Sequence, residues 1–496
     1  MVAFILPANS ATGGYEIDNS LRFNDGDSPS MTIASLGSSS SNAKKWTVSF
    51  WAKLSSLTAH RCVFSAGEAS GGEYVQINFT DEDKLQLYSS NSLGAADDTA
   101  TNIRTNALHR DPSAWYHVVW AIDFTDGTAG DRIKLYVNGS RVTSFELTNN
   151  IPAQDTDNDR VGANNIDHFI GKFVDSSSEY FDGYLAEFNF IDGDAKAASD
   201  FGETNDNGVW IPKAYSGSYG NNGFLLEFKS SGTSQNSSGI GADTSGNDNH
   251  FAVSNLAAID VTTDTPTNNF CTFNPLDNAV LTLSEGNTKA THSSSSGGEE
   301  NRGTMGFANG KWYWEFQIGY DVPTNRLQPF GVGLLTNTGR NPLESDLKTT
   351  EAYTVHWYTD TSNNLVIEKV FNSGTNVTAS ESYPDNGDIV QFAIDADAGK
   401  VWVGKNNTYL DDASGNVGDP ANGNYPIHTY TVVEGNFIFP AIVNVGSQGL
   451  TILLNTGNPS FAISSGNADA NGYGNFEHAP PSGFYSICSK NLAEFG

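Results

Sequence analysis

Hydrophobic residues recur at every second position in many stretches of this chain, which is the period of a β-strand. The stretch FDGYLAEFNFIDG, residues 181–193, shows the pattern and then stops at an Asp-Gly turn. One parity holds Tyr184, Ala186, Phe188 and Phe190, and the other holds Leu185, Glu187, Asn189 and Ile191. A regular strand would turn the first set toward a core and the second set outward.

Three more stretches in the first half alternate in the same way. In KKWTVSFWAKL the inward set is Trp46, Val48, Phe50 and Ala52, and in WYHVVWAID it is Tyr116, Val118, Trp120 and Ile122. In DRIKLYVNGSRV the set Ile133, Leu135 and Val137 faces one way, and Arg132, Lys134 and Tyr136 face the other. Asn138-Gly139 then predicts a two-residue hairpin turn, since both central residues need a positive φ.

The second half repeats the strand pattern. In GKWYWEFQI the inward set is Trp312, Trp314, Phe316 and Ile318, and in GDIVQFAIDADAGKVWVGKNN it is Val390, Phe392 and Ile394. An Asp-rich hairpin turn is expected at 395–400. Because strand patterns fill both halves without a helical period, the sequence predicts an all-β protein of two antiparallel, jelly-roll type β-sandwich domains.

Five strand motifs of the first half, in this order, resemble the laminin G-like, concanavalin A-like family over residues 15–195: SLRFNDGD, WTVSFWAKL, WYHVVWAID, RIKLYVNGSRV and FDGYLAEFNFIDG. The resemblance implies a sandwich fold. It does not decide the function, because that fold carries lectins, adhesins and glycosidases.

Residues 271–496 resemble a SPRY domain through GKWYWEFQI, PFGVGL, the Asp-rich hairpin, FIFPAIVN and GFYSICSKNL. That family consists of interaction modules and implies no catalysis. Residues 196–270, rich in Gly, Ser and Asn, are expected to form an irregular connector, with GFLLEFK as a possible strand returning to the first sandwich. The two modules and the connector together are similar to fibre-like or appendage proteins of marine tailed bacteriophages.

The composition agrees with a particle protein. The 26 basic and 57 acidic residues give a net charge of −31, which argues against binding nucleic acid or inserting into an anionic membrane. Three distant cysteines, Cys62, Cys271 and Cys488, offer no disulfide framework. The start MVAFILPANS does not read as a secretion signal. A virion assembled in the host cytoplasm and released by lysis would reconcile these features.

Catalytic patterns are missing from the sequence. A sandwich glycosidase needs two carboxyl groups facing one groove, whereas Glu187 and Asp192 have opposite parity and Glu315 stands alone. The nine histidines form no metal motif, and no nucleophile–base set appears. We therefore expect a protein that is not an enzyme, the alternatives being a glycan-active enzyme on the first sandwich and a free lectin.

Two groups of residues are candidate sites. Asp155, Asp157 and Asp159 alternate like the start of a calcium loop, but Arg160 and Ile166 stand where an EF-hand needs Gly and Glu. They predict either a Ca²⁺ site at a loop rim or a solvated turn; no other cofactor is expected. Trp210, Tyr215 and Tyr219 predict either a stacking platform for a sugar ligand or a packed contact between the domains.

The expected partners follow from the virion hypothesis. The apolar run Val2–Leu6 lies in an N-terminal anchoring segment, residues 1–14, which either packs on its own sandwich or docks on another virion protein. Because repeated weak contacts gain avidity, we expect a homo-oligomer, a trimer before a dimer, that attaches to a glycan or protein of the host surface.

Overall fold

The fold was taken from a computed structural model of the 496-residue chain. The structure describes residues 14–68, 72–90, 93, 100–174, 176–277, 281–292, 299–319, 330–336, 352–359, 365–370, 375–377, 384–412, 414–432, 437–444 and 450–496. The apolar segment Val2–Leu6 lies outside these residues. The chain forms two compact units, an N-terminal unit that ends at Asn269 and a C-terminal unit that begins at Phe270.

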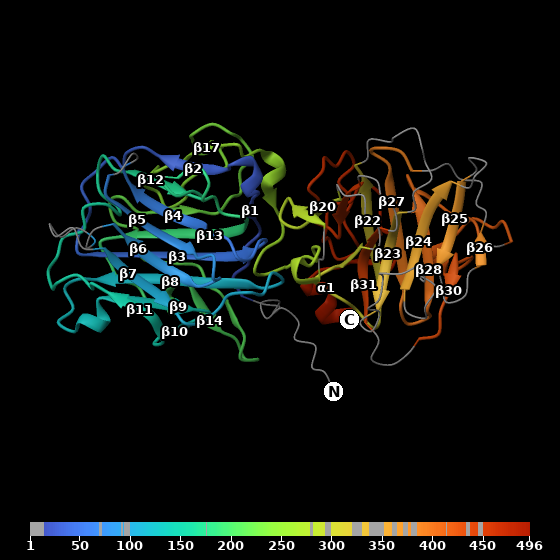
Figure 1. Ribbon diagram of the computed structural model, residues 1–496, viewed down its shortest axis with the longest axis horizontal. Helices are drawn as coiled ribbons and strands as arrows, with labels where there is room; N and C mark the ends of the chain where they lie inside the picture. The colour runs from blue at the N-terminus through green and yellow to red at the C-terminus, as the bar shows by residue number, and fades with distance from the viewer. Residues whose placement is uncertain are drawn as a thin grey trace. The chain divides into compact units, whose positions relative to one another are not determined.

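Two antiparallel sheets form the N-terminal unit, whose strands run from blue to green in Figure 1. The first sheet has the order β10 (Ser140–Arg141), β9 (Ile133–Val137), β8 (Trp115–Asp123), β3 (Lys45–Leu54), β13 (Gly183–Asp192), β1 (Ser20–Phe23) and β18 (Val261–Thr262), with β16 (Phe224–Leu226) also paired to β13. The second has the order β11 (Phe145–Asn149), β7 (Thr101–Thr105), β6 (Leu85–Ser89), β5 (Tyr74–Phe79), β4 (Arg61–Gly67), β12 (Asp167–Ile170), β2 (Ser30–Ile33) and β17 (Ala252–Ser254).

One hydrophobic core joins these two sheets. The Phe64 ring of β4 lies 5.9 Å from the Phe188 ring of β13, so the inner faces of the two sheets meet. The predicted inward sets of β3 and β8 belong to this core. The predicted hairpin turn is also confirmed, because Asn138 and Gly139 have φ of 47° and 78° between β9 and β10. Residues 196–269 contribute β16, β17 and β18 to the two sheets.

The C-terminal unit also contains two sheets. The first has the order β19 (Thr282–Ser284), β20 (Lys289–His292), β32 (Leu450–Asn455), β22 (Lys311–Ile318), β27 (Ile389–Asp395), β28 (Lys400–Lys405) and β29 (Thr408–Tyr409), while β30 (His428–Thr429) pairs with β28 and β33 (Tyr485–Ser486) with β22. The second has the order β21 (Glu299–Arg302), β31 (Ile438–Asn444), β23 (Phe330–Thr336), β24 (Ala352–Thr359), β25 (Leu365–Val370) and β26 (Thr375–Val377).

The core of this unit confirms the parity predicted for its strands. The inward rows of β22 and β27 are buried together with Ile438 and Ile442 of β31. The Trp314 and Phe392 rings stack at 5.3 Å across neighbouring strands. The hairpin predicted at 395–400 joins β27 to β28.

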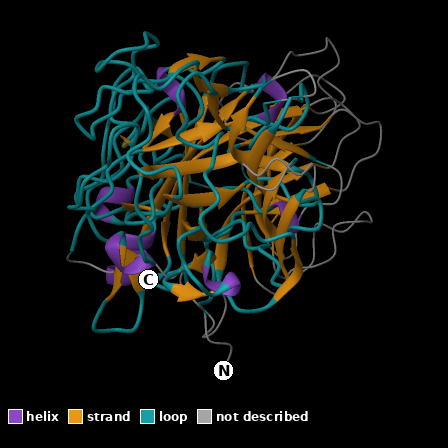
Figure 2. Ribbon diagram, turned by 90° about the vertical axis from the view of Figure 1, so that its left-hand side faces the viewer, coloured by secondary structure: helices purple, strands orange, loops and turns teal. Residues whose placement is uncertain are grey.

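Helical structure is sparse in the described part of the chain, as Figure 2 shows. It comprises α1 (Ser489–Phe495) and the 3₁₀ turns η1 (Asp25–Asp27), η2 (Ala129–Asp131), η3 (Ala198–Asp200), η4 (Ala258–Asp260), η5 (Pro275–Asp277) and η6 (Pro420–Asn422). The all-β fold class is therefore confirmed. Within the described residues, no helix combines the length and hydropathy that crossing a membrane requires.

The strand β13 corrects one prediction. Its pairing with β3 shifts between Ala186 and Asn189, because Glu187 forms a β-bulge with a φ of 45°. The bulge reverses the parity, so Leu185, Phe188 and Phe190 face the core, while Tyr184, Ala186 and Ile191 face the other side. All ten residues of β13 are buried, so the expected outward set does not face solvent.

Candidate functional site

An aromatic cluster covers the outer face of the first sheet of the N-terminal unit. We call it the aromatic face: the half-buried Tyr136, Trp210, Tyr215 and Tyr219, which pack against Val119, Ile191, Ala198 and Phe201. The structure therefore brings together the three aromatic residues singled out from the sequence and adds Tyr136. All of them belong to the N-terminal unit and contact one another through its first sheet.

Trp210 is held by a two-stranded hairpin, β14 (Gly202–Thr204) and β15 (Trp210–Pro212). Its ring lies so close to Gly139 and Gly202 that a Cβ at either glycine would come within 2.4 Å and 2.5 Å of ring carbons. Glycine at these two positions is thus what allows the indole to lie flat against the hairpins. Trp210 is a tightly fitted residue rather than a free platform.

His117 of β8 lies beneath Trp210 and is buried. The indole Nε1–H of Trp210 donates to His117 Nδ1 at 3.1 Å, and His117 Nε2 lies 2.9 Å from Ser49 Oγ. Since an indole nitrogen can only donate, Nδ1 must be the acceptor and the ring proton must sit on Nε2. Burial lowers the pKa of His117 to about 3, so the ring is neutral at physiological pH.

Tyr215 and Tyr219 form a second part of the aromatic face. The Tyr215 ring stacks on Phe201 at 5.0 Å and meets the Tyr219 ring edge-on at 5.1 Å. The Tyr215 hydroxyl donates to the Ser218 carbonyl at 2.9 Å, and the Tyr219 hydroxyl donates to Asn189 Oδ1 at 2.9 Å. Fixed rings with fixed hydroxyls give a preformed surface that combines apolar area with polar groups.

Glu187 lies beside this cluster but is buried, with only 5% of its surface exposed. Its carboxyl is hydrogen-bonded to the Tyr15 hydroxyl, and its Oε2 has no hydrogen-bond partner. Burial, reinforced by the nearby Glu227, raises the pKa of Glu187 to about 8. The group is therefore mostly protonated at neutral pH and inaccessible to a large substrate.

The three aspartates of the predicted calcium loop are not gathered into one site. Asp155 pairs with Lys44 at 3.4 Å, and Asp159 pairs with Arg160 at 3.3 Å. Asp157 is exposed. No group of three or more His, Cys, Asp or Glu side chains suited to a metal ion occurs among the residues that the structure describes.

Glu315 of the C-terminal unit is a buried structural acceptor. Its Oε1 accepts from the Tyr313 hydroxyl and the His478 N–H, and its Oε2 accepts from Asn455 and the Glu477 N–H, all at 2.8–3.0 Å. Burial raises the pKa of Glu315 to about 7. These bonds fasten the segment around Glu477 and His478 to β22, which gives the buried carboxyl a structural role.

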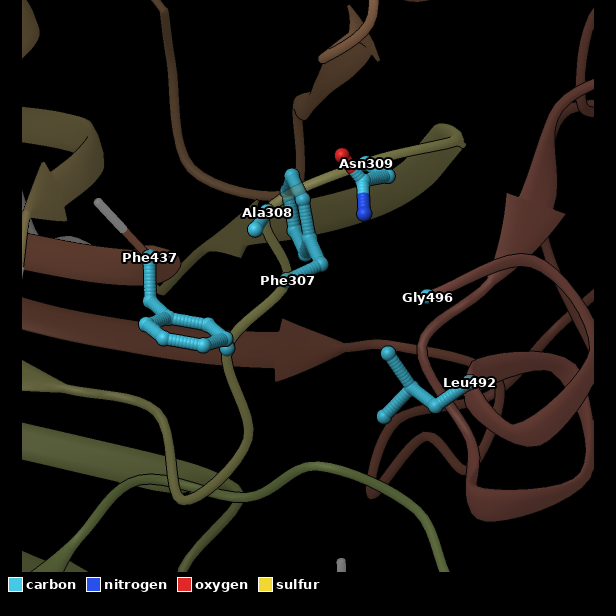
Figure 3. Close-up of a pocket in the computed structure, with 7 residues that line it drawn as sticks. Phe307, Ala308, Asn309, Phe437, Leu492 and Gly496 are labelled. Carbon is cyan, nitrogen blue, oxygen red and sulfur yellow. The ribbon is translucent and has the colours of Figure 1, made fainter. Parts of the chain in front are cut away.

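A mostly apolar pocket of about 260 Å³ opens in the same unit. Figure 3 shows the rings of Phe307 and Phe437 and the side chain of Leu492 around it, with Asn309 at its edge. Phe307 is fixed by stacking on Trp312 at 5.3 Å. Among the described residues that line it, Asn309 is the one with a polar side chain, so the lining offers mainly hydrophobic contact.

Comparison with known proteins agrees with this fold. Residues 25–200 match the family model Laminin_G_3, described as the concanavalin A-like lectin/glucanases superfamily. No curated protein matches the chain.

Several solved structures are similar at low identity. The SPRY domain of human HERC1 is 16% identical, with 37% of this chain and 96% of that chain covered and a TM-score of 0.27. The mouse laminin alpha1 chain, domains LG4-5, is 9% identical. The match covers 96% of this chain and 100% of that chain, with a TM-score of 0.27. A heptameric SAP-like pentraxin from Limulus polyphemus is 16% identical. The match covers 37% of this chain and 80% of that chain, with a TM-score of 0.26.

The family match falls on the part of the N-terminal unit that contains β3, β8 and β13, the strands beneath the aromatic face. Residues 25–200 are therefore a laminin G-like, concanavalin A-like domain.

Proposed function

We propose that this protein is a non-enzymatic structural component of a bacteriophage particle, a tail fibre, spike or head appendage, that displays binding modules for a glycan or protein of the host surface. The aromatic face carries the binding part of the proposal, because it places half-buried rings and fixed hydroxyls on one sheet of a concanavalin A-like domain. The particle origin rests on the resemblance of the two modules and connector to phage appendage proteins.

The chemistry of the aromatic face suits a sugar ligand. A pyranose presents an apolar face that can pack on a tyrosine ring, while its hydroxyls need hydrogen-bond partners. Tyr215 supplies a ring fixed by Phe201, and Lys196 and Asp194 lie beside it as polar groups. Each such contact is weak, so attachment would depend on several copies acting together.

Calorimetric titration of the purified protein with host-surface polysaccharide tests the binding part. Tyr215→Ala is expected to weaken binding by about five- to tenfold, because it removes a stacked ring. Tyr88→Ala is the matched control, since Tyr88 is also half-buried but belongs to β6 of the opposite sheet. Equal affinities for the two variants would contradict a binding role of the aromatic face.

Mass spectrometry of purified phage particles tests the particle part. The proposal expects the chain among the structural proteins of the particle. Its presence only as a free protein would favour a free lectin.

The alternative of a glycan-active enzyme has one specific observation in its favour, the raised pKa of Glu187 near the second carboxyl of Glu227. Against it, Glu187 is buried and hydrogen-bonded to Tyr15. A reducing-sugar assay on the same polysaccharide separates the two readings. Cleavage by the native chain that Glu187→Gln abolishes would establish the enzyme.

A further inference from the structure

Three reactive side chains meet inside the N-terminal unit. Lys53 Nζ, near the end of β3, donates to Asp264 Oδ2 at 2.8 Å and to Asn269 Oδ1 at 2.7 Å. Lys53 is 1% exposed, Asp264 is fully buried and Asn269 is 2% exposed. A primary amine, a carboxyl group and a carboxamide thus lie in direct contact and away from water.

The surroundings of this triad are aromatic and orient its members. The Tyr184 ring lies 5.5 Å from Lys53 Nζ, and the buried Trp115 donates its indole N–H to Asp264 Oδ1 at 3.2 Å. The Nδ2 of Asn269 donates to the Ser113 carbonyl at 2.5 Å. This bond fixes the carboxamide with its oxygen toward the amine and its nitrogen on the other side.

We propose that Lys53 and Asn269 join through an intramolecular amide bond, and that Asp264 is the catalytic residue that moves the proton. Asp264 takes a proton from the Lys53 ammonium, which leaves a neutral amine as nucleophile. The amine nitrogen attacks Cγ of Asn269, and the C–N bond to Nδ2 breaks. Nδ2 leaves as ammonia after taking up one proton: Asp264 donates its proton to Nδ2 and accepts the proton that the attacking nitrogen loses. The amine and carboxamide give a secondary amide and ammonia, without an oxidant or cofactor.

The geometry satisfies the requirements of this reaction. A hydrogen bond of 2.7 Å to Oδ1 puts Nζ within about 4 Å of Cγ, since the C=O bond is about 1.23 Å long. Reacting atoms in productive complexes lie about 3–3.5 Å apart, so a small movement is enough.

A noncovalent ion pair is the competing explanation, and two other pairs show the difference. Arg61 and Asp83 form a buried pair at 2.7 Å, but a guanidinium keeps its charge and is no nucleophile. Lys45 and Asp123 form a pair at 3.0 Å, with a quarter of the Lys45 side chain exposed. The Lys53–Asp264 pair differs from both of these pairs. It is buried, and the carboxamide of Asn269 accepts a hydrogen bond from the same Lys53 amine.

The bond would lock the last segment of the N-terminal unit. Lys53 and Asn269 are 216 positions apart, so the bond would close most of the unit into one covalent loop. Asn269 is the final residue of this unit, which places the bond where the chain leaves it. A cross-link over such a span restricts the unfolded chain strongly, in the way a disulfide does.

Peptide mapping of the purified full chain by mass spectrometry tests the proposal. We expect the tryptic peptide of residues 46–61, uncut after Lys53, joined to the peptide that contains Asn269, with a mass about 17 Da below the sum of the two because ammonia is lost. Unlinked peptides with Asn269 as the amide, or hydrolysed to Asp, would overturn the proposal.

Two variants and a control locate the chemistry. Asp264→Asn keeps the size of the side chain and removes its proton-accepting role, and Lys53→Arg removes the nucleophile; both should lose the 17 Da deficit. A melting temperature lower by about 5 °C or more should accompany the loss. The control Lys45→Arg should keep the deficit. A deficit that persists in Asp264→Asn would exclude Asp264 as the catalytic residue.

Discussion

The indole Nε1–H of Trp210 donates to Nδ1 of His117 at 3.1 Å, and the two rings stack with centroids 5.9 Å apart. The Trp51 ring stacks on His117 as well, at 4.6 Å, so the imidazole contacts two indoles. This stack connects β3, β8 and the hairpin that holds Trp210. It makes His117 a structural centre of the aromatic face.

Replacing His117 should destabilise the N-terminal unit. His117→Ala leaves the indole N–H of Trp210 without its acceptor and opens a cavity, so we expect a loss of about 2–4 kcal/mol in the free energy of unfolding. Urea denaturation measures it, with the half-exposed His60→Ala as control, expected within about 0.5 kcal/mol of the native chain. Trp210→Phe keeps an aromatic ring, so it should lower the free energy of unfolding by less than His117→Ala does. A larger decrease would show that the packing of the indole contributes more than its hydrogen bond to His117.

Gly202→Ala should displace Trp210. The added Cβ would lie 2.5 Å from the indole, and the Gly202 backbone itself allows an alanine. We expect a loss of about 1–3 kcal/mol and a change in tryptophan fluorescence. Gly127→Ala is the control because its Cβ would meet nothing within 4 Å. Equal stability of the two variants would show that the indole does not rest on Gly202.

The pH dependence of stability should show a plateau with a fall on each side. Burial raises the pKa of Glu187 to about 8 and of Asp182 and Glu315 to about 7, against ordinary values of 4.5 for Glu and 3.8 for Asp. The folded chain thus keeps protons that the unfolded chain has released, and stability falls as the pH rises toward about 8.

The buried histidines act in the opposite direction. Burial lowers the pKa of His117 to about 3 and of His109 and His168 to about 4, so the unfolded chain takes up protons first as the pH falls below 6.5. Between about pH 4.5 and 6.5 the buried carboxyl groups make stability fall with rising pH, and the buried histidines make it rise. The two contributions oppose each other and leave a plateau in the free energy of unfolding. Chemical denaturation should show that Glu187→Gln removes at least about 1.4 kcal/mol of the loss between about pH 6 and 8.5. An unchanged loss would mean that Glu187 is ionised in the folded state.

The aspartate loop should behave as a solvated turn. Because Asp155 and Asp159 face Lys44 and Arg160, we expect EDTA and Ca²⁺ to leave the melting temperature within about 1 °C. A rise with Ca²⁺ that Asp157→Asn removes would instead identify a calcium site.

The oligomeric state is a prediction of the virion hypothesis. Light scattering of the purified chain should give three times 53.1 kDa, and deletion of residues 1–10 should lower incorporation into particles while circular dichroism stays that of a β-protein. A monomer at micromolar concentration would remove self-assembly as the source of avidity.

Alternation along the sequence predicted the fold well where a strand is regular and one face meets the core. The inward rows of β3, β8, β22 and β27 are the clearest cases. The same reasoning failed for β13, because nothing in the alternation of FDGYLAEFNFIDG marks the bulge at Glu187. The alternation argument also predicted that the outer face of this sheet meets solvent. In the structure, residues from distant parts of the chain cover that face.

The candidate site was predicted only in part for the same physical reason. Aromatic content pointed to Trp210, Tyr215 and Tyr219, but Tyr136 and His117 join them only through strand pairing. Parity could have suggested Tyr136, which shares the outward row of β9 with Lys134. The contact of Lys53 with Asn269 spans 216 positions, and no local pattern signals such a contact.

The bulge at Glu187 makes β13 two short strands in opposite phase. A regular strand that kept all of these residues would move Tyr184 and Ala186 to the inner side, or the two phenylalanines to the outer side, whereas deleting the extra residue would leave every other side chain on its present face. The extra residue at position 187 therefore decides which side chains of β13 reach the core. A sequence alignment that places a gap elsewhere in β13 would match inner residues with outer ones, so relatives of this chain are best aligned with the gap at position 187.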